Sequence, residues 1–173
     1  MIEKIILVDE SNNEIGIDEK LIAHIKGSLH RAISVFIFNS KNELLIQQRN
    51  KSKYHSAGLW SNTCCSHPRP KENVLAAAHR RLKEEMGFDC EVEEIFLLRY
   101  KIKLENNITE NECDHVFIGY YNNDPKPDPK EASDYKWISI KELKENIKES
   151  PEDYTYWFKI ALDKVVKKYS SIS

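Results

Sequence analysis

Several short stretches of the chain alternate apolar with polar residues or form compact apolar runs, which is the pattern of β-strands. Polar turns such as Ser40-Lys41-Asn42 separate neighbouring stretches. The strands predicted in this way cover residues 5–8, 15–17, 32–39, 43–49, 59–63, 90–104, 109–121 and 135–138. The first two lie on either side of a polar turn and are expected to form a hairpin.

Other stretches repeat their apolar residues every three or four positions, which predicts helices. The predicted helices cover residues 18–25, 72–86, 140–148 and 152–169. Asp18 is the expected N-cap of the first helix and Gly27 its stop, while Gly87 ends the second. The order of strands, helix, strands and helices predicts an α+β fold with an α/β/α sandwich architecture.

Composition places the chain among ordinary globular proteins. Its 173 residues are 40% hydrophobic and 31% charged, with a formal net charge of −2. We therefore expect one domain spanning residues 1–173, with no general attraction to nucleic acid or to a membrane. No apolar run is long enough for a signal peptide core or a membrane span. The four cysteines form no C-x-x-C pair, so they are interpreted as reduced thiols of a cytoplasmic protein.

Two carboxylates are candidate metal ligands. Glu110 and Glu112 lie two positions apart on a predicted strand, so their side chains point to one face. Such a pair repels unless a cation or proton lies between the carboxylates, although alone it is more often a solvated strand face. Together with His24, His30 and His67 it forms a mixed nitrogen and oxygen set that suits zinc, manganese or iron.

The remaining histidines are expected to lie outside this set. His55 falls in a polar loop and His79 on the long predicted helix. His115 belongs to the same strand as the two glutamates but faces the opposite side.

Phosphate recognition would have to come from separate cations, because the chain contains no P-loop and no G-x-G-x-x-G motif. The candidates are Lys20, Arg49, Lys53 and Arg81. Arg81 and Glu85 lie four apart on the second predicted helix. They are interpreted either as a surface ion pair or as a phosphate-binding arginine beside a Mg²⁺ carboxylate.

Cys65 also has two interpretations. A buried cysteine is usually an inert small hydrophobe. Because it lies two residues before His67, Cys65 is alternatively an acid or base whose thiol pKa is tuned by nearby cations.

Four segments taken together resemble a known family. They are Leu59-Trp60-Ser61-Asn62-Thr63-Cys64-Cys65-Ser66-His67-Pro68, Arg80-Arg81-Leu82-Lys83-Glu84-Glu85-Met86-Gly87, Thr109-Glu110-Asn111-Glu112, and the early histidine segments Ala23-His24 and Leu29-His30-Arg31-Ala32. In this order they resemble the type I isopentenyl diphosphate isomerases of the Nudix superfamily. The resemblance extends from about residue 5 to about residue 158.

The resemblance implies a Nudix α/β/α sandwich with mixed sheets and a role for each matching residue. It implies a first metal, Mn²⁺ or Zn²⁺, bound by His24, His30, His67, Glu110 and Glu112. It implies Mg²⁺ on Glu85 and the Cys65 carbonyl, bridging to a diphosphate that is neutralised by Lys20, Arg49, Lys53 and Arg81. The implied proton-transfer pair is Cys65 and Glu112, with Tyr100 beside Glu112, and Trp157 lines the hydrocarbon pocket.

The implied reaction converts isopentenyl diphosphate into dimethylallyl diphosphate through a carbocation in isoprenoid precursor biosynthesis. The expected partner is the small-molecule diphosphate substrate, and the protein is expected to be a monomer or a weak homodimer. Two alternatives stay open: a Nudix diphosphate hydrolase, and a non-catalytic diphosphate-binding module. The hydrolase motif has Glu at the position of Arg81, which favours the isomerase. Trp157 has its own alternative, because it belongs to an apolar stripe of the last helix and could be a core anchor.

Overall fold

The computed structural model describes residues 2–172. Its strands are β1 Lys4–Val8, β2 Glu14–Glu19, β3 His30–Phe38, β4 Glu43–Arg49, β5 Trp60–Ser61, β6 Cys64–Ser66, β7 Val92–Lys103, β8 Thr109–Tyr120 and β9 Ala132–Ser139. Its α-helices are α1 Lys20–Lys26, α2 Val74–Arg81, α3 Ile140–Glu149 and α4 Tyr156–Ile172. A π-helical turn, η1 Leu82–Met86, continues α2, and the 3₁₀ turns are η2 Glu105–Asn107 and η3 Pro151–Asp153.

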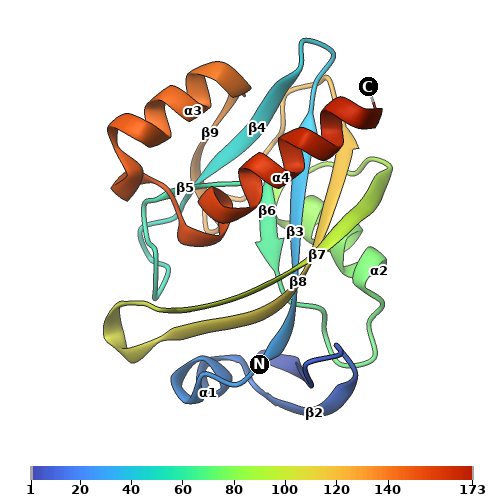
Figure 1. The fold of residues 1–173 in the computed structure, drawn as a ribbon, viewed down its shortest axis with the longest axis vertical. Helices are drawn as coiled ribbons and strands as arrows, with labels where there is room; N and C mark the ends of the chain where they lie inside the picture. The colour runs from blue at the N-terminus through green and yellow to red at the C-terminus, as the bar shows by residue number, and fades with distance from the viewer. Residues whose placement is uncertain (1, 173) are drawn as a thin grey trace.

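Strand β3 is the centre of a mixed sheet. It pairs in parallel with β8 along its whole length and antiparallel with β1, β4 and β6. The hairpin of β7 and β8 extends the sheet on one side, and β9 pairs with β4 on the other. Figure 1 shows the long β7–β8 hairpin reaching past the end of the sheet, close to α1 and the N-terminal strands. The mixed α+β arrangement is the one that the sequence predicted.

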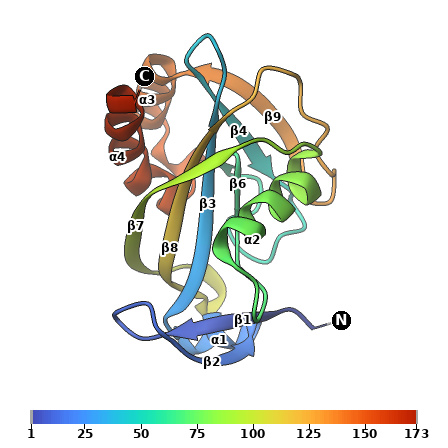
Figure 2. The same ribbon diagram turned by 90° about the vertical axis from the view of Figure 1, so that its right-hand side faces the viewer.

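Helices α2 and α4 lie on opposite sides of this sheet (Figure 2). On β3, Phe36 and Phe38 pack with α4, whereas Val35 and Ile37 pack with α2. Because side chains alternate along a strand, one apolar run supplies both cores. Among residues 2–172, no helix is long and apolar enough to cross a membrane.

Two predicted element boundaries were wrong at the start of a helix. Asp18 does not cap α1, because it pairs with Ile5 as part of β2, and the cap residue is Glu19, with no side-chain cap bond. The last helix begins at Tyr156 rather than at residue 152, because Pro151 opens the 3₁₀ turn η3 before it. The helix stops at Gly27 and Gly87 are confirmed, with φ of 65° and 72°.

The predicted strand at residues 59–63 is interrupted. Only Trp60 and Ser61 pair with β4, and the chain then crosses over so that β6 pairs with β3. Polar side chains replace the missing ladder bonds at the crossover: Thr63 Oγ1 donates to the Leu45 carbonyl at 2.6 Å, and Asn62 Nδ2 donates to Val35 at 3.2 Å. This crossover brings Cys65 and the residues after it to the end of β3 where the site lies.

Candidate active site

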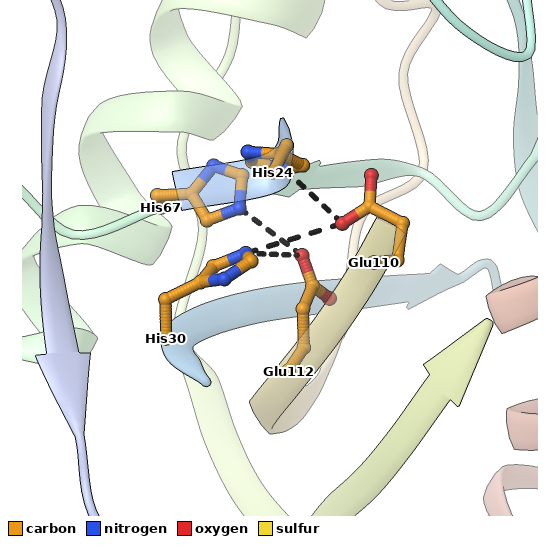
Figure 3. A group of neighbouring side chains, drawn as sticks. All are labelled: His24, His30, His67, Glu110 and Glu112. Atoms are coloured by element: carbon orange, nitrogen blue, oxygen red, sulfur yellow. Dashed lines mark hydrogen bonds and ion pairs between the residues drawn. The ribbon is translucent and has the colours of Figure 1, made fainter. Parts of the chain in front are cut away.

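Five side chains converge at one end of the β3–β8 pair. His24 comes from α1, His30 begins β3, His67 follows β6, and Glu110 and Glu112 lie on β8. The parallel register sets His30 directly beside Glu112. One potential ligand atom of each residue lies within 4.8 Å of all the others, and all five residues are buried (Figure 3). These are the five residues that the sequence singled out as a candidate metal set.

The outer hydrogen bonds of two histidines fix the tautomers of their rings. His24 Nδ1 donates to the Lys20 carbonyl at 2.6 Å, and His30 Nδ1 donates to the Ser28 carbonyl at 2.8 Å. In the neutral rings Nε2 is therefore an acceptor. Both Nε2 atoms face Oε2 of Glu110, at 3.1 and 3.9 Å, and none of these three atoms has a hydrogen-bond partner among residues 2–172. Buried hydrogen-bond acceptors that face one another repel unless a cation lies between them. The lone pairs of these atoms can coordinate such a cation, so the arrangement fits a metal ion.

Glu112 has partners on both of its oxygens. Oε1 accepts from His67 Nε2 at 3.0 Å, and Oε2 accepts from the Tyr100 hydroxyl at 2.6 Å. Burial opposes ionisation of Glu112, but contacts with His30 and His67 outweigh it and hold the pKa of its carboxyl well below the ordinary value. Burial and the charge of Glu112 raise the pKa of Glu110. The two glutamates thus differ in proton affinity although they lie on one strand.

His55 does not lie apart from the cluster, as its polar loop had suggested. Its ring is buried, and Nε2 lies 3.1 Å from Oε1 of Glu110. Burial and the nearby Arg49 lower the pKa of the ring to about 3. The loop folds inward because the Arg49 guanidinium donates to the His55 and Ser56 carbonyls, a tertiary contact with no signature in the sequence. His79 and His115 do lie elsewhere, paired with Asp89 and Glu94.

A cavity of about 260 Å³ opens beside the five-residue cluster. This volume is slightly below the roughly 300–1,000 Å³ of pockets for drug-sized ligands, so the cavity suits a small molecule. The predicted site residues that line it are Lys20, Arg49, Lys53, Cys65, His67, Arg81, Glu85, Tyr100, Glu110, Glu112 and Trp157. His24 and His30 lie behind them in the cluster.

Cys65 lies at the base of this cavity, next to a cation. Arg49 Nη1 donates to its Sγ at 4.0 Å, and the Ser61 hydroxyl lies at 3.9 Å. Burial raises the pKa of the Cys65 thiol to about 12, although Arg49 opposes the shift. The thiol of the ligand-free protein therefore carries its proton at neutral pH.

Trp157 belongs both to the hydrophobic core and to the cavity wall. Its indole Nε1 donates to Ser61 Oγ at 3.0 Å, and the Arg49 guanidinium carbon lies 5.3 Å from the ring centroid. A cation therefore already lies within the range of the indole quadrupole.

Most of the predicted phosphate-binding cations are paired with carboxylates. Lys20 pairs with Glu3 at 3.1 Å, Lys53 pairs with Glu131, and Arg81 Nη2 lies 3.3 Å from Glu131 Oε1. Glu131 was missed in the sequence because it lies in a loop before β9 with no repeating pattern. Its position between two cations comes only from the folded chain.

Arg81 and Glu85 are not a surface pair. Glu85 is buried on the π-helical turn, where Arg81 Nη2 donates to its Oε1 at 2.8 Å. Although burial opposes it, the Glu85 carboxylate raises the pKa of Arg81 above its ordinary value. Gln47 Nε2 donates to Oε2 of Glu85 at 2.8 Å. Each carboxylate oxygen has two lone pairs, so Glu85 keeps capacity for a cation.

Comparison with known proteins gives the family to which this chain belongs. The NUDIX domain family matches residues 28–158. The crystal structure of DR0079 from Deinococcus radiodurans superposes with a TM-score of 0.74 over 96% of this chain and 98% of its own, at 17% sequence identity. The fold is therefore a Nudix fold, and the chain is a member of the Nudix superfamily.

Full-length relatives narrow the class further. The chain is 53% identical to isopentenyl-diphosphate Delta-isomerase 1 of Aromatoleum aromaticum, over 96% of this chain and 94% of the relative. It is 48% identical to isopentenyl-diphosphate Delta-isomerase of Pectobacterium atrosepticum, over 94% and 90% of the two chains. The chain belongs to the type I isopentenyl-diphosphate Delta-isomerase family.

Proposed function

We propose that this enzyme interconverts isopentenyl diphosphate and dimethylallyl diphosphate by adding a proton at one carbon and removing a proton from another. The observation that carries the proposal is the convergence on one small cavity of four cations, a half-buried thiol and a cluster of histidines and glutamates. A diphosphate needs the cations, and a double-bond shift needs groups that exchange protons. The named relatives support the same substrate.

Binding of the diphosphate is assigned to the cations at the cavity wall. Lys20, Lys53 and Arg81 have carboxylate partners, so phosphate oxygens would exchange places with or join those carboxylates. Among residues 2–172, Arg49 forms no ion pair with a carboxylate, and it donates instead to the backbone carbonyls of His55 and Ser56. We propose that Arg49 binds the diphosphate with a positive charge that no carboxylate has neutralised.

The two metal sites are proposed from the donor atoms. His24, His30, His67, Glu110 and Glu112 would bind Mn²⁺ or Zn²⁺, and the unpartnered Nε2 and Oε2 atoms support this set. Glu85 and the Cys65 carbonyl would bind Mg²⁺ together with phosphate oxygens. When bound, these ions supply positive charge that neutralises the carboxylates and the diphosphate.

Proton transfer is assigned to Cys65 and Glu112. The Cys65 thiol carries a proton at Sγ, and Glu112 is an ionised carboxylate in hydrogen-bond contact with the Tyr100 hydroxyl. Both groups line the cavity, so a carbon skeleton held between them meets one donor and one acceptor. Tyr100 would orient the carboxyl of Glu112 during the transfer.

The intermediate of this reaction is a tertiary carbocation, which water would trap. The cavity must therefore exclude water around the hydrocarbon end of the substrate. Trp157 lines the cavity and offers an aromatic face, which stabilises a cation by its quadrupole. We propose that its ring faces the hydrocarbon end.

The proposed setting is the cytoplasm, in isoprenoid precursor synthesis. The four cysteines are free thiols, which supports a reducing compartment.

The test is to incubate the protein with isopentenyl diphosphate, Mg²⁺ and Mn²⁺ and to follow the products by ³¹P and ¹H NMR. We expect dimethylallyl diphosphate as the product, with no release of inorganic phosphate. Release of inorganic phosphate would instead identify a hydrolase, and binding without turnover would identify a non-catalytic module.

A further inference from the structure

In each glutamate of the metal cluster, one carboxylate oxygen faces the cluster histidines and the other faces a residue outside the cluster. Glu112 turns Oε1 toward His67 and His30, at 3.0 and 3.5 Å, and its Oε2 accepts from Tyr100. Glu110 turns Oε2 toward His24, at 3.1 Å. Its other oxygen, Oε1, lies 3.1 Å from Nε2 of His55. The outer oxygen of each glutamate therefore faces a side chain outside the cluster: Tyr100 donates a hydrogen bond to Glu112, and His55 Nε2 lies within contact distance of Glu110.

The His55 ring is held in this orientation by its surroundings. It is 6% exposed, and its centroid lies 4.5 Å from Tyr54 and 5.9 Å from Trp157, both with edge-to-face geometry. Nδ1 lies 3.5 Å from the Ser56 hydroxyl, which can donate to it. A neutral imidazole has one N–H, so this arrangement leaves the proton on Nε2, facing Glu110.

The backbone of the loop is also shaped for this contact. Ser56 has φ of 49°, in the left-handed region that a residue with a side chain rarely adopts. Arg49 Nη2 donates to the His55 carbonyl at 3.3 Å, and Arg49 Nε donates to the Ser56 carbonyl at 3.2 Å. Backbone strain of this kind persists where the surroundings fix it, often at functional sites.

We propose that His55 is a positioning residue of the metal centre, which donates from Nε2 to Oε1 of Glu110 and so directs Oε2 into the cluster. The inference rests on the proposed metal centre. A carboxylate fixed in advance binds a cation without losing rotational freedom, and partners of this kind typically contribute about 10- to 100-fold to metal affinity. The role is indirect, because His55 binds the carboxylate and the carboxylate binds the metal.

The experiment titrates Mn²⁺ alone into chelator-treated protein by isothermal calorimetry. His55→Phe keeps the ring contacts and removes the donor, while His55→Asn keeps polarity but falls short of Glu110. Both should weaken Mn²⁺ binding by about 10- to 100-fold. His55→Gln places an amide N–H near the position of Nε2 and should retain affinity within about threefold of wild type. His79→Phe, at a partly buried histidine that pairs with Asp89 outside the cluster, is the matched control and should leave affinity unchanged.

Several outcomes would overturn the inference. Wild-type affinity in both His55→Phe and His55→Asn would remove the role, as would equal losses in His55→Gln and His55→Asn with native circular dichroism spectra. X-ray absorption of the Zn²⁺-loaded protein separates positioning from ligation. The same number of imidazole ligands in wild type and His55→Gln supports positioning, whereas one fewer in the variant would make His55 a ligand. Failure of wild type itself to bind Mn²⁺ would refute the metal centre instead.

Discussion

Replacing Glu110 by Gln should change stability in opposite directions with and without metal. The substitution keeps the size of the side chain and removes one of two buried charges. The ligand atoms of the cluster lie within 4.8 Å of one another. Two unit charges at that separation repel by about 3.5 kcal/mol at an effective dielectric constant of about 20. Burial and the charge of Glu112 raise the pKa of Glu110, so protonation already relieves part of this repulsion.

We therefore expect Glu110→Gln to stabilise the metal-free protein by about 1–2 kcal/mol, which raises Tm by roughly 2–8 °C for a chain of this size. Metal at about 100 times its Kd should stabilise wild type by about 2.7 kcal/mol, or roughly 5–11 °C. The variant lacks one charged ligand, so metal should raise its Tm much less.

The assay is thermal unfolding followed by circular dichroism, with a chelator and then with excess Mn²⁺. Glu105→Gln removes an exposed carboxylate from the same β7–β8 hairpin and is the control, with no expected change in either condition. A variant less stable than wild type in chelator, or an equal metal-induced rise in Tm in both proteins, would refute the reasoning.

Three further predictions concern the site and its scaffold. Cys65→Ala should lower kcat by at least about 10²-fold and leave the Kd for isopentenyl diphosphate nearly unchanged, and near-normal turnover would remove Cys65 from the mechanism. Gly119→Ala should lower Tm through a loss of about 1–3 kcal/mol, because an added Cβ would lie 2.6 Å from the Glu91 carbonyl oxygen, whereas Gly16→Ala meets no atom within 4 Å and should be neutral. Hydrogen bonds from Arg80 lower the pKa of Glu72, so this carboxylate stabilises the fold above its unfolded pKa of 4.5 and loses that contribution as the pH falls through its folded pKa. Urea unfolding of Glu72→Gln should show a deficit of about 1 kcal/mol at pH 7 that shrinks as the pH falls below 4.5, and a deficit independent of pH would contradict the assignment.

The sequence predicted the central strands well because their apolar pattern serves two cores at once. The residues of β3 alternate between the α2 and α4 sides, so the run had to be long and apolar. Helix ends were predictable where a glycine adopts positive φ, as at Gly87. The start of α1 was not predictable, because Asp18 pairs with Ile5 of β1 and so belongs to β2. Strand pairing of this kind depends on residues that are distant in the sequence.

In the site, too, local sequence patterns were predictable and contacts between distant residues were not. Glu110 and Glu112 were expected to share a strand face by local geometry. Their residue types suggested His24, His30 and His67 as partners, and the family resemblance implied the same set. The contacts of His55 and Glu131 escaped prediction because both residues lie in loops, where no periodicity marks the side chains that turn inward. The position of His55 depends on bonds from Arg49 to the loop backbone, and that of Glu131 on two cations from other elements.

The central claim is that side chains of this protein exchange protons with the carbon skeleton of isopentenyl diphosphate. Acidic S–H and carboxyl protons exchange with solvent, so turnover in deuterated water with Mg²⁺ and Mn²⁺ tests the claim directly by ²H NMR and mass spectrometry of the product. We expect dimethylallyl diphosphate that carries deuterium at the newly formed methyl group, with the diphosphate intact. Unlabelled dimethylallyl diphosphate, or release of inorganic phosphate in its place, would contradict it.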